Sequence, residues 1–154
     1  MSFLHGQRRH VLGILDGLDV DALCQPVPPS GWNCLGLVQH LVLDVEQFWF
    51  RAVAVGEEDV IKSLRDGGDA WQAGPDAPAS AILDRYRAET DLADTITATA
   101  ADTPWPGGPT TSPASHTCTL RDILLHVITE TGCHAGHLDA AREVLDGRRW
   151  MALA

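Results

Sequence analysis

The sequence predicts an all-α protein, built as a four-helix bundle in a single domain over residues 1–154. Four stretches carry apolar residues at helical spacing, and the second and fourth are bounded by residues that begin or end helices. No stretch of useful length shows the alternation of apolar and polar residues that is typical of a strand. A chain of 154 residues is long enough for one domain with a real core, and four helices of this length most simply form a bundle.

A first helix is expected over residues 3–18, which mix apolar and polar positions at roughly helical spacing and contain no proline. A short helical turn should follow over residues 18–23. Residues 26–31 read Pro-Val-Pro-Pro-Ser-Gly, which indicates a loop.

The second helix is expected over residues 33–54. Asn33 is a good N-cap, and Gly56 closes the helix. The apolar stripe predicted to face the core comprises Val38, Leu41, Val42, Val45, Phe48, Trp49 and Ala52.

Residues 56–77 are acidic and rich in glycine, so we expect an irregular loop there, with a short turn near residues 61–64. A third helix fits residues 79–98. Its inward-facing residues should be Ile82, Tyr86, Leu92 and Ile96. Residues 102–117 contain four prolines and two glycines, which predicts a long loop that is a candidate lid over a site.

The fourth helix is the longest. Thr119 followed by Asp122 resembles a capping box and marks its beginning, and Gly147 marks its end.

The charge balance limits the class of partner. Eleven Lys and Arg residues against 21 Asp and Glu residues give a formal net charge of −10. Nucleic acids and anionic membrane surfaces both bind surfaces that are rich in Lys and Arg, so neither is expected as a partner. The composition, rich in Ala, Gly, Asp and Arg, hints at a GC-rich bacterial genome.

The cysteine pattern argues against a zinc ribbon or a disulfide framework. Cys24, Cys34, Cys118 and Cys133 form no C-x-x-C pair and have no regular spacing. No leader-like segment and no run of 18 apolar residues is present, so a cytoplasmic protein with reduced thiols is expected.

The most informative feature is a cluster of metal-capable residues in the fourth helix, spaced His126-x3-Glu130-x3-His134-x2-His137. On a helical wheel with His126 at zero, these side chains share an arc of roughly 80°. The apolar residues of the segment centre near ~110°, so Glu130 and His134 point toward the side expected to be buried. An unpaired buried carboxylate is expensive, and a shared cation is the simplest remedy.

The donor types indicate the metal. Imidazole and carboxylate at i, i+4 suit zinc, nickel or iron(II). The spacing is not that of the H-E-x-x-H metalloproteases, and it is not a di-iron bundle because Cys133 stands three residues after Glu130. His40, on the second helix, is the best further donor. The pattern is compatible with His40 in a polar cleft or in plain solvent. For the cluster in the fourth helix, the alternatives to a metal site are polar residues on the surface or hydrogen-bonded histidines in the core.

Two segments resemble a known family, the DinB-like (DinB/YfiT) superfamily. The first is residues 36–41, Gly-Leu-Val-Gln-His-Leu, followed by residues 46–51, Glu-Gln-Phe-Trp-Phe-Arg. The second is residues 125–137, Leu-His-Val-Ile-Thr-Glu-Thr-Gly-Cys-His-Ala-Gly-His, running to Glu-Val-Leu-Asp-Gly at residues 143–147. The nearest branch is DUF664, which is common in actinobacteria.

The resemblance implies the DinB/YfiT-like metalloenzyme fold, a four-helix bundle that is often a homodimer. It implies one divalent metal, with zinc foremost and nickel or iron as alternatives, on His40, Glu130 and His134. Many members carry His where this chain has Glu130, and Gln where it has His137. The pair His134 and His137 therefore competes with Glu130 and His134, and a site with four ligands is also open.

The resemblance also implies a low-molecular-weight thiol as cosubstrate, of the mycothiol type, or bacillithiol or glutathione. The expected activity is then transfer of the thiol sulfur to a small-molecule electrophile, as in detoxification. Alternatives are a thiol-dependent isomerase, similar to the mycothiol-dependent maleylpyruvate isomerase, or hydrolysis by a metal-bound water. A non-catalytic metal- or ligand-binding bundle is the alternative from another class. His126 and His137 are candidates for orienting the ligands or for shuttling protons.

Asp44, Trp49 and Cys133 are candidates for the substrate pocket. Core packing explains Trp49 more simply, and a small buried filler is the favoured interpretation of Cys133, ahead of a reactive thiol or a ligand. Trp32 is a further aromatic candidate, and Trp105, in the proline-rich loop, is a candidate cover for the site.

Overall fold

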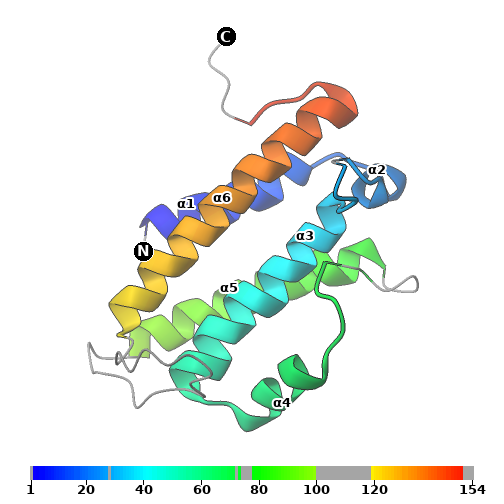
Figure 1. Cartoon of the computed structure of the whole chain (residues 1–154). Helices are drawn as coiled ribbons and strands as arrows, with labels where there is room; N and C mark the ends of the chain where they lie inside the picture. The colour runs from blue at the N-terminus through cyan, green and yellow to red at the C-terminus, as the bar shows by residue number, and fades with distance from the viewer. Residues whose placement is uncertain (1, 28, 72, 74–77, 100–118, 151–154) are drawn as a thin grey trace.

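The protein is helical, and no strand occurs among the residues that the structure describes (Figure 1). The computed structural model describes residues 2–27, 29–71, 73, 78–99 and 119–150. The elements in chain order are α1 (Ser2–Leu15), α2 (Val20–Cys24), α3 (Cys34–His40), η1 (Leu41–Val55), α4 (Glu58–Asp66), α5 (Ala79–Thr99) and α6 (Leu120–Asp146). The all-α prediction is confirmed. None of the helices in these ranges is long and apolar enough to span a membrane.

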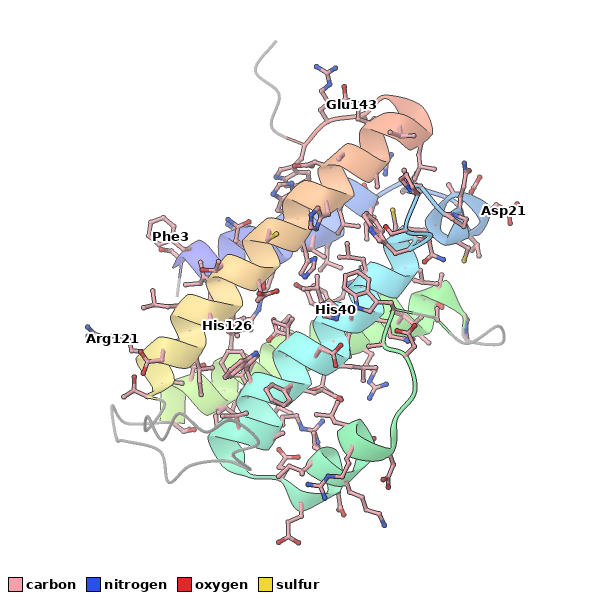
Figure 2. All side chains as sticks on the ribbon, viewed as in Figure 1. Phe3, Asp21, His40, Arg121, His126 and Glu143 are labelled. Atoms are coloured by element: carbon pink, nitrogen blue, oxygen red, sulfur yellow. The ribbon has the colours of Figure 1, made fainter. Side chains whose placement is uncertain are left out.

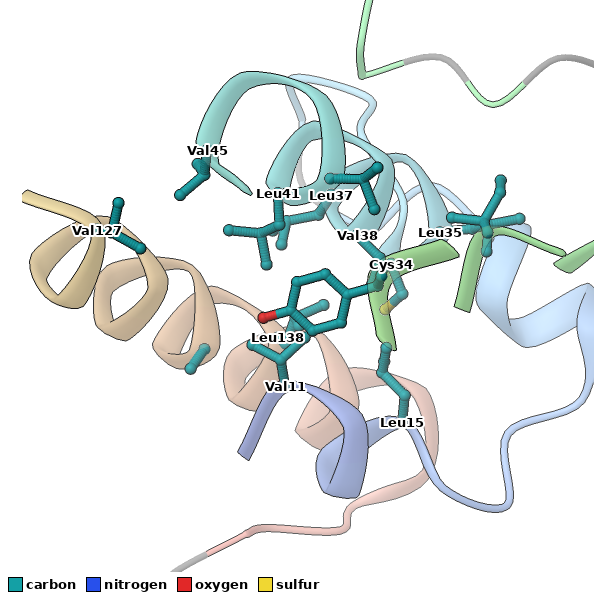
Figure 3. Close-up of a cluster of buried hydrophobic side chains, with 14 of the residues drawn as sticks. Val11, Leu15, Cys34, Leu35, Leu37, Val38, Leu41, Val45, Val127 and Leu138 are labelled. Carbon is teal, nitrogen blue, oxygen red and sulfur yellow. The ribbon is translucent and has the colours of Figure 1, made fainter. Parts of the chain in front are cut away.

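The four long helical segments that the sequence predicts all form and pack on one another. α6 lies along α1, while α3 and η1 run on as one rod that contacts both α5 and α6 (Figure 1). Side chains on the outer surface, such as Phe3 and Arg121, point away from this assembly (Figure 2). The shared core is built from buried side chains of α1, the α3–η1 rod, α5 and α6, among them the fully buried Val11, Leu37, Val38, Leu41 and Leu138 (Figure 3). The packing of α3 against α6 brings the second and last predicted helices face to face.

The caps predicted from the sequence are confirmed. The Asn33 side chain accepts a hydrogen bond from the Gly36 N–H at 2.7 Å and so begins α3. Thr119 and Asp122 form a reciprocal capping box at the start of α6, and Gly147 ends that helix with φ of 78°. Gly56 ends η1 in the same left-handed conformation, with φ of 76°.

The second half of the rod is a π-helix, which the sequence did not predict. Residues 41–55 follow the wider i→i+5 hydrogen-bond pattern, as when the Gly56 N–H donates to the Arg51 carbonyl. The core positions Leu41, Phe50 and Ala54 are each fully buried. A π-helix advances less per residue than the ~100° of an α-helix, so a stripe drawn at α-helical spacing drifts away from the true buried face.

This drift explains one wrong and one partial prediction for the second helix. Phe48 was expected to face the core but is 40% exposed, and Trp49 is half-buried. Glu46, Gln47 and Phe50 are buried in their place. Two of these are polar, so the wider helix has placed hydrogen-bonding groups in the protein interior.

Glu46 is paired with a buried arginine. Arg8 Nε and Nη2 donate to the two carboxylate oxygens of Glu46 at 2.8 and 2.6 Å, and Arg8 Nη1 donates to Asp94 at 2.7 Å. Only 5% of Arg8 and 1% of Glu46 are exposed. Burial raises the pKa of Glu46, and the Arg8 guanidinium acts in the opposite direction. The pair joins α1, η1 and α5 at one point.

A second polar contact joins η1 to α5 and corrects the face predicted for α5. Leu92 was expected inward but is 37% exposed, whereas Glu89 and Ala93 are buried. Glu89 accepts hydrogen bonds from Gln47 at 2.5 Å and from Arg51 at 3.0 Å. Pairing with these side chains allows a carboxylate to occupy an inward position that the sequence pattern assigned to a leucine.

The loop prediction for residues 56–77 is wrong in its first half. α4 occupies Glu58–Asp66, more than the short turn expected near residues 61–64. Its apolar residues Val60, Ile61 and Leu64 lie at helical spacing, but the acidic and glycine-rich composition of the whole stretch favoured a loop in the prediction. The candidate lid over residues 102–117, with Trp105, lies outside the described residues.

Candidate metal centre

Three of the predicted ligands come together between α3 and α6. His40, Glu130 and His134 each place one ligand atom so that all three lie within 4.8 Å of one another. His134 Nε2 is 3.4 Å from Glu130 Oε2, and the His40 and His134 rings meet edge to face with centroids 4.9 Å apart. Figure 2 shows His40 on α3, and His126 nearer the start of α6. Two helices far apart in sequence therefore supply one compact donor group.

His40 is the last residue of α3, and Trp71 stacks on its ring, so it is largely shielded from solvent. Its side chain is 14% exposed, and Nδ1 is 2.8 Å from Asp44 Oδ2 on the first turn of η1. A proton on Nδ1 donated to this carboxylate leaves the Nε2 lone pair free for a cation. Asp44, predicted as a pocket residue, is thus a direct partner of His40.

His134 lies deepest of the three donors. It is 7% exposed, as the wheel predicted for the inner margin of this helix, while the Glu130 side chain is 38% exposed. Burial, with a further contribution from the His40 ring, lowers the pKa of His134. The neutral imidazole, which is the form that binds metals, is therefore favoured at neutral pH.

The other two histidines of the cluster lie outside the three-donor group. His137 is exposed, and its Nδ1 is 3.3 Å from His134 Nδ1, so it borders the site from the solvent side. His126 is exposed and packs against Trp49, with ring centroids 4.4 Å apart. His137 is therefore in contact with the candidate ligand His134. His126 instead contacts Trp49, which is not one of the three donors.

Trp49 packs against the core, as its favoured interpretation predicts, whereas Cys133 is placed differently from the prediction. Cys133 is exposed, so its interpretation as a buried filler is wrong. The position falls on the solvent side of α6, next to the exposed Gly136 and His137. Trp49 contacts Phe48 and His126 and is not part of the three-donor group.

Sequence reasoning missed Trp71, which covers the site. Its ring stacks on His40 at 4.2 Å with an interplanar angle of 17°, and it meets His134 at 5.6 Å. The segment is held close to α3, because the Ala70 carbonyl accepts a hydrogen bond from Gln39 Nε2 at 3.0 Å. A Cβ on Gly36 would lie 2.1 Å from the Trp71 carbonyl oxygen. A glycine inside a helix was the available signal for such a close approach.

Gly36→Ala is expected to lower the free energy of unfolding by about 1–3 kcal/mol, the usual range for overpacking. The added methyl group meets backbone, which cannot rotate away as a side chain does. Urea denaturation measures the change. Gly136→Ala is the matched control, because nothing lies within 4 Å of a Cβ there and alanine favours helix by up to ~1 kcal/mol. Equal stabilisation by both substitutions would contradict the close approach of Trp71.

The donor group fits a divalent cation. Two imidazoles and one carboxylate are the ligands that suit zinc and its neighbours, and a set of three leaves coordination positions open for a substrate. The Asp44 carboxylate behind His40 is the kind of partner that orients metal-binding histidines.

Asp44→Ala is expected to weaken zinc binding by about 10–100-fold, because His40 loses the hydrogen bond that fixes its tautomer and ring plane. Competition with a chromophoric chelator measures the affinity. Asp84→Ala, which removes an exposed carboxylate on α5, is the control and should leave the affinity unchanged. An unaltered affinity in Asp44→Ala would show that the hydrogen bond does not orient the ligand.

An all-α fold that brings a His/Glu/His group together between its second and last long helices defines a DinB-like helical protein with a candidate metal site. Comparison with protein families then identifies the group more narrowly. The model of the family described as MST, Mycothiol-S-transferase, matches residues 1–147, and the chain belongs to this family. No curated protein and no solved structure matches the chain.

The family match confirms the predicted membership of the DinB-like superfamily. The narrower assignment to the DUF664 branch and the relation to the maleylpyruvate isomerase stay predictions. The homodimer and the actinobacterial origin stay predictions as well.

Proposed function

We propose that the protein is a metal-dependent mycothiol S-transferase that joins the thiol to small electrophiles in detoxification. The convergence of His40, Glu130 and His134, in a chain of the mycothiol-S-transferase family, carries this proposal. The three residues would hold one divalent cation, with zinc foremost and nickel or iron as alternatives. When bound, such a cation lowers the pKa of a coordinating thiol, so that the thiolate is present at neutral pH.

The residues of the chain supply the rest of the environment. Asp44 holds the His40 ring by the hydrogen bond to Nδ1, and burial keeps His134 neutral. Trp71 covers one face of His40 and limits the access of water to it. Glu130 is then a ligand rather than a general base.

The proposed reaction releases one proton, from the thiol. A carbon–sulfur bond forms between the thiol sulfur and the electrophilic carbon, and the leaving group departs with the bonding electron pair. The thiol proton is released, and His137 is placed to pass it to solvent because it is exposed and borders His134.

Metal-dependent turnover tests the proposal. The protein is incubated with mycothiol and 1-chloro-2,4-dinitrobenzene, and the thioether is followed by its absorbance. Turnover above the uncatalysed rate should be lost after treatment with a chelator and restored by added zinc. Glu143→Ala, on the exposed face of α6, is the matched control and should respond to metal as the wild type does. Turnover that survives removal of the metal, or the absence of any turnover, would contradict the proposal.

The size of the donor group bears on the non-catalytic alternative. A structural metal site closes its coordination sphere with four protein ligands, whereas a catalytic one keeps a position open. Within the part of the chain that the structure describes, the group contains three donors. This supports an open site and hence a catalytic function.

A further inference from the structure

A hollow of about 270 Å³ is lined by Ser30, Trp32, Asp69 and Trp71, and the Trp71 ring separates it from His40 and His134. Both of its aromatic walls contact histidines of the cluster. Trp71 stacks on His40, and Trp32 lies 6.1 Å from the His137 ring. A molecule in this hollow would therefore lie beside the three donors, without occupying their place.

The Trp71 wall is fixed to α3 rather than loosely placed. Its backbone lies against Gly36, where a Cβ would come within 2.1 Å, and the preceding carbonyl accepts the Gln39 hydrogen bond. Asp69 Oδ1 also accepts a hydrogen bond from the Trp71 N–H at 2.9 Å. This contact holds the carboxylate at the hollow.

The Trp32 wall is fixed to the same end of α3. The Val27 N–H donates to the Trp32 carbonyl at 3.3 Å. The next residue, Asn33, caps α3 and also donates from Nδ2 to the Cys24 carbonyl at 3.1 Å. Both walls are therefore attached to one helix, α3, and the hollow is formed before a ligand arrives.

The lining selects a chemical class of ligand. Two indole rings favour a ligand with flat faces of C–H groups, and the Ser30 hydroxyl and Asp69 carboxylate favour one that carries many hydroxyl groups. A saturated ring bearing hydroxyls, as in a sugar or a cyclitol, has both properties. The carboxylate disfavours phosphates and other anions, and a purely apolar ligand would leave it unused.

We propose that the hollow binds the polyol part of the thiol, the glucosaminyl-inositol unit of mycothiol, and so selects this thiol over simpler ones. The inference rests on the proposed function. Small-molecule pockets that enclose a whole ligand measure about 300–1,000 Å³, so a hollow of about 270 Å³ suits one of the two rings of this unit, with the other ring at its open side. The cysteinyl end of the same molecule then extends toward the three donors.

The test compares mycothiol with N-acetylcysteine, which has the sulfur without the polyol, as cosubstrates of the zinc-loaded protein. Asp69→Asn keeps an oxygen for the Trp71 N–H but removes the charge. It should raise KM for mycothiol about tenfold, since a charged acceptor is roughly twice as strong as a neutral one, and leave kcat unchanged. Kinetics with N-acetylcysteine should not change. Trp32→Leu should also raise KM for mycothiol. Trp150→Leu, which removes a tryptophan stacked on His10, should leave the kinetics with both thiols unchanged.

Calorimetric titration with N-acetylglucosaminyl-inositol, which lacks sulfur and carries an amide in place of a free amine, separates this inference from the proposed function. Binding to the wild type that is weakened in Asp69→Asn and Trp32→Leu supports the hollow even if no thiol is transferred. Transfer with equal kcat/KM for mycothiol and N-acetylcysteine, unaffected by both substitutions, overturns the hollow and leaves the transferase intact. The proposed role of the hollow is also overturned if the substitutions change KM for the electrophile but not KM for mycothiol. Circular dichroism establishes that each variant is folded.

Discussion

Glu46→Ala is expected to lower the free energy of unfolding by about 3–5 kcal/mol, the range for breaking a buried ion pair from one side. Arg8 would remain 5% exposed, and its Nε and Nη2 donors would lose both carboxylate oxygens. Asp94 would still accept from Nη1, but its side chain is 35% exposed and does not reach the two abandoned donors. Urea denaturation followed by circular dichroism measures the change.

Removal of both charges provides the control. The double substitution Arg8→Met with Glu46→Leu fills the space with apolar side chains and leaves no buried charge, so it should recover most of the lost stability. Asp84→Ala, which breaks an exposed pair with Arg87, should change stability by no more than about 0.5 kcal/mol. A Glu46→Ala protein as stable as Asp84→Ala would mean that Arg8 and Glu46 do not form the buried pair.

Features that depend on a few neighbouring residues were predictable from the sequence. Asn33 caps α3 and Thr119 with Asp122 caps α6 because the hydrogen bonds join residues three apart in the chain. Gly147 ends α6 for a similarly local reason, since glycine adopts a positive φ without strain. The beginnings of α3 and α6 and the end of α6 therefore followed from local chemistry, whereas α4 was missed.

Features that depend on the partners of a residue were not predictable. Glu46 and Glu89 are buried because Arg8 and Arg51 meet them from distant parts of the chain, and no local pattern announces this. The π-helical geometry of residues 41–55 shifts the buried face away from the stripe expected for an α-helix. The error at Phe48 has this origin.

The site divides along the same line. Glu130 and His134 belong to one helix at i, i+4, so their proximity was readable from spacing. The place of His40 beside these two residues followed from the resemblance, whereas the helical wheel alone left it open. Trp71 could not be placed because its approach depends on a glycine 35 residues earlier in the chain. The sequence therefore predicts the residues that surround the candidate site less well than it predicts the candidate ligands.

Glu130→Ala is expected to weaken zinc binding by more than about 100-fold, beyond the losses typical of outer partners. The carboxylate is one of the three donors within 4.8 Å of one another, and its removal leaves His40 and His134 alone. His137→Ala is the decisive companion variant, because the sequence left His134 with His137 as a competing pair. It should retain the metal, since His137 Nδ1 faces His134 Nδ1, while His134 Nε2 faces Glu130.

For both variants, the metal content of untagged protein is measured by mass spectrometry, and the zinc affinity is measured by competition with a chelator. Loss of zinc in His137→Ala with retention in Glu130→Ala would replace Glu130 by His137 as the third ligand. Loss in both variants would indicate four protein ligands, which closes the coordination sphere and removes the position that the thiol needs. Glu130→His separates ligand chemistry from side-chain packing, because imidazole can replace the carboxylate as a donor. Zinc retained in Glu130→His but lost in Glu130→Ala would establish position 130 as a ligand position.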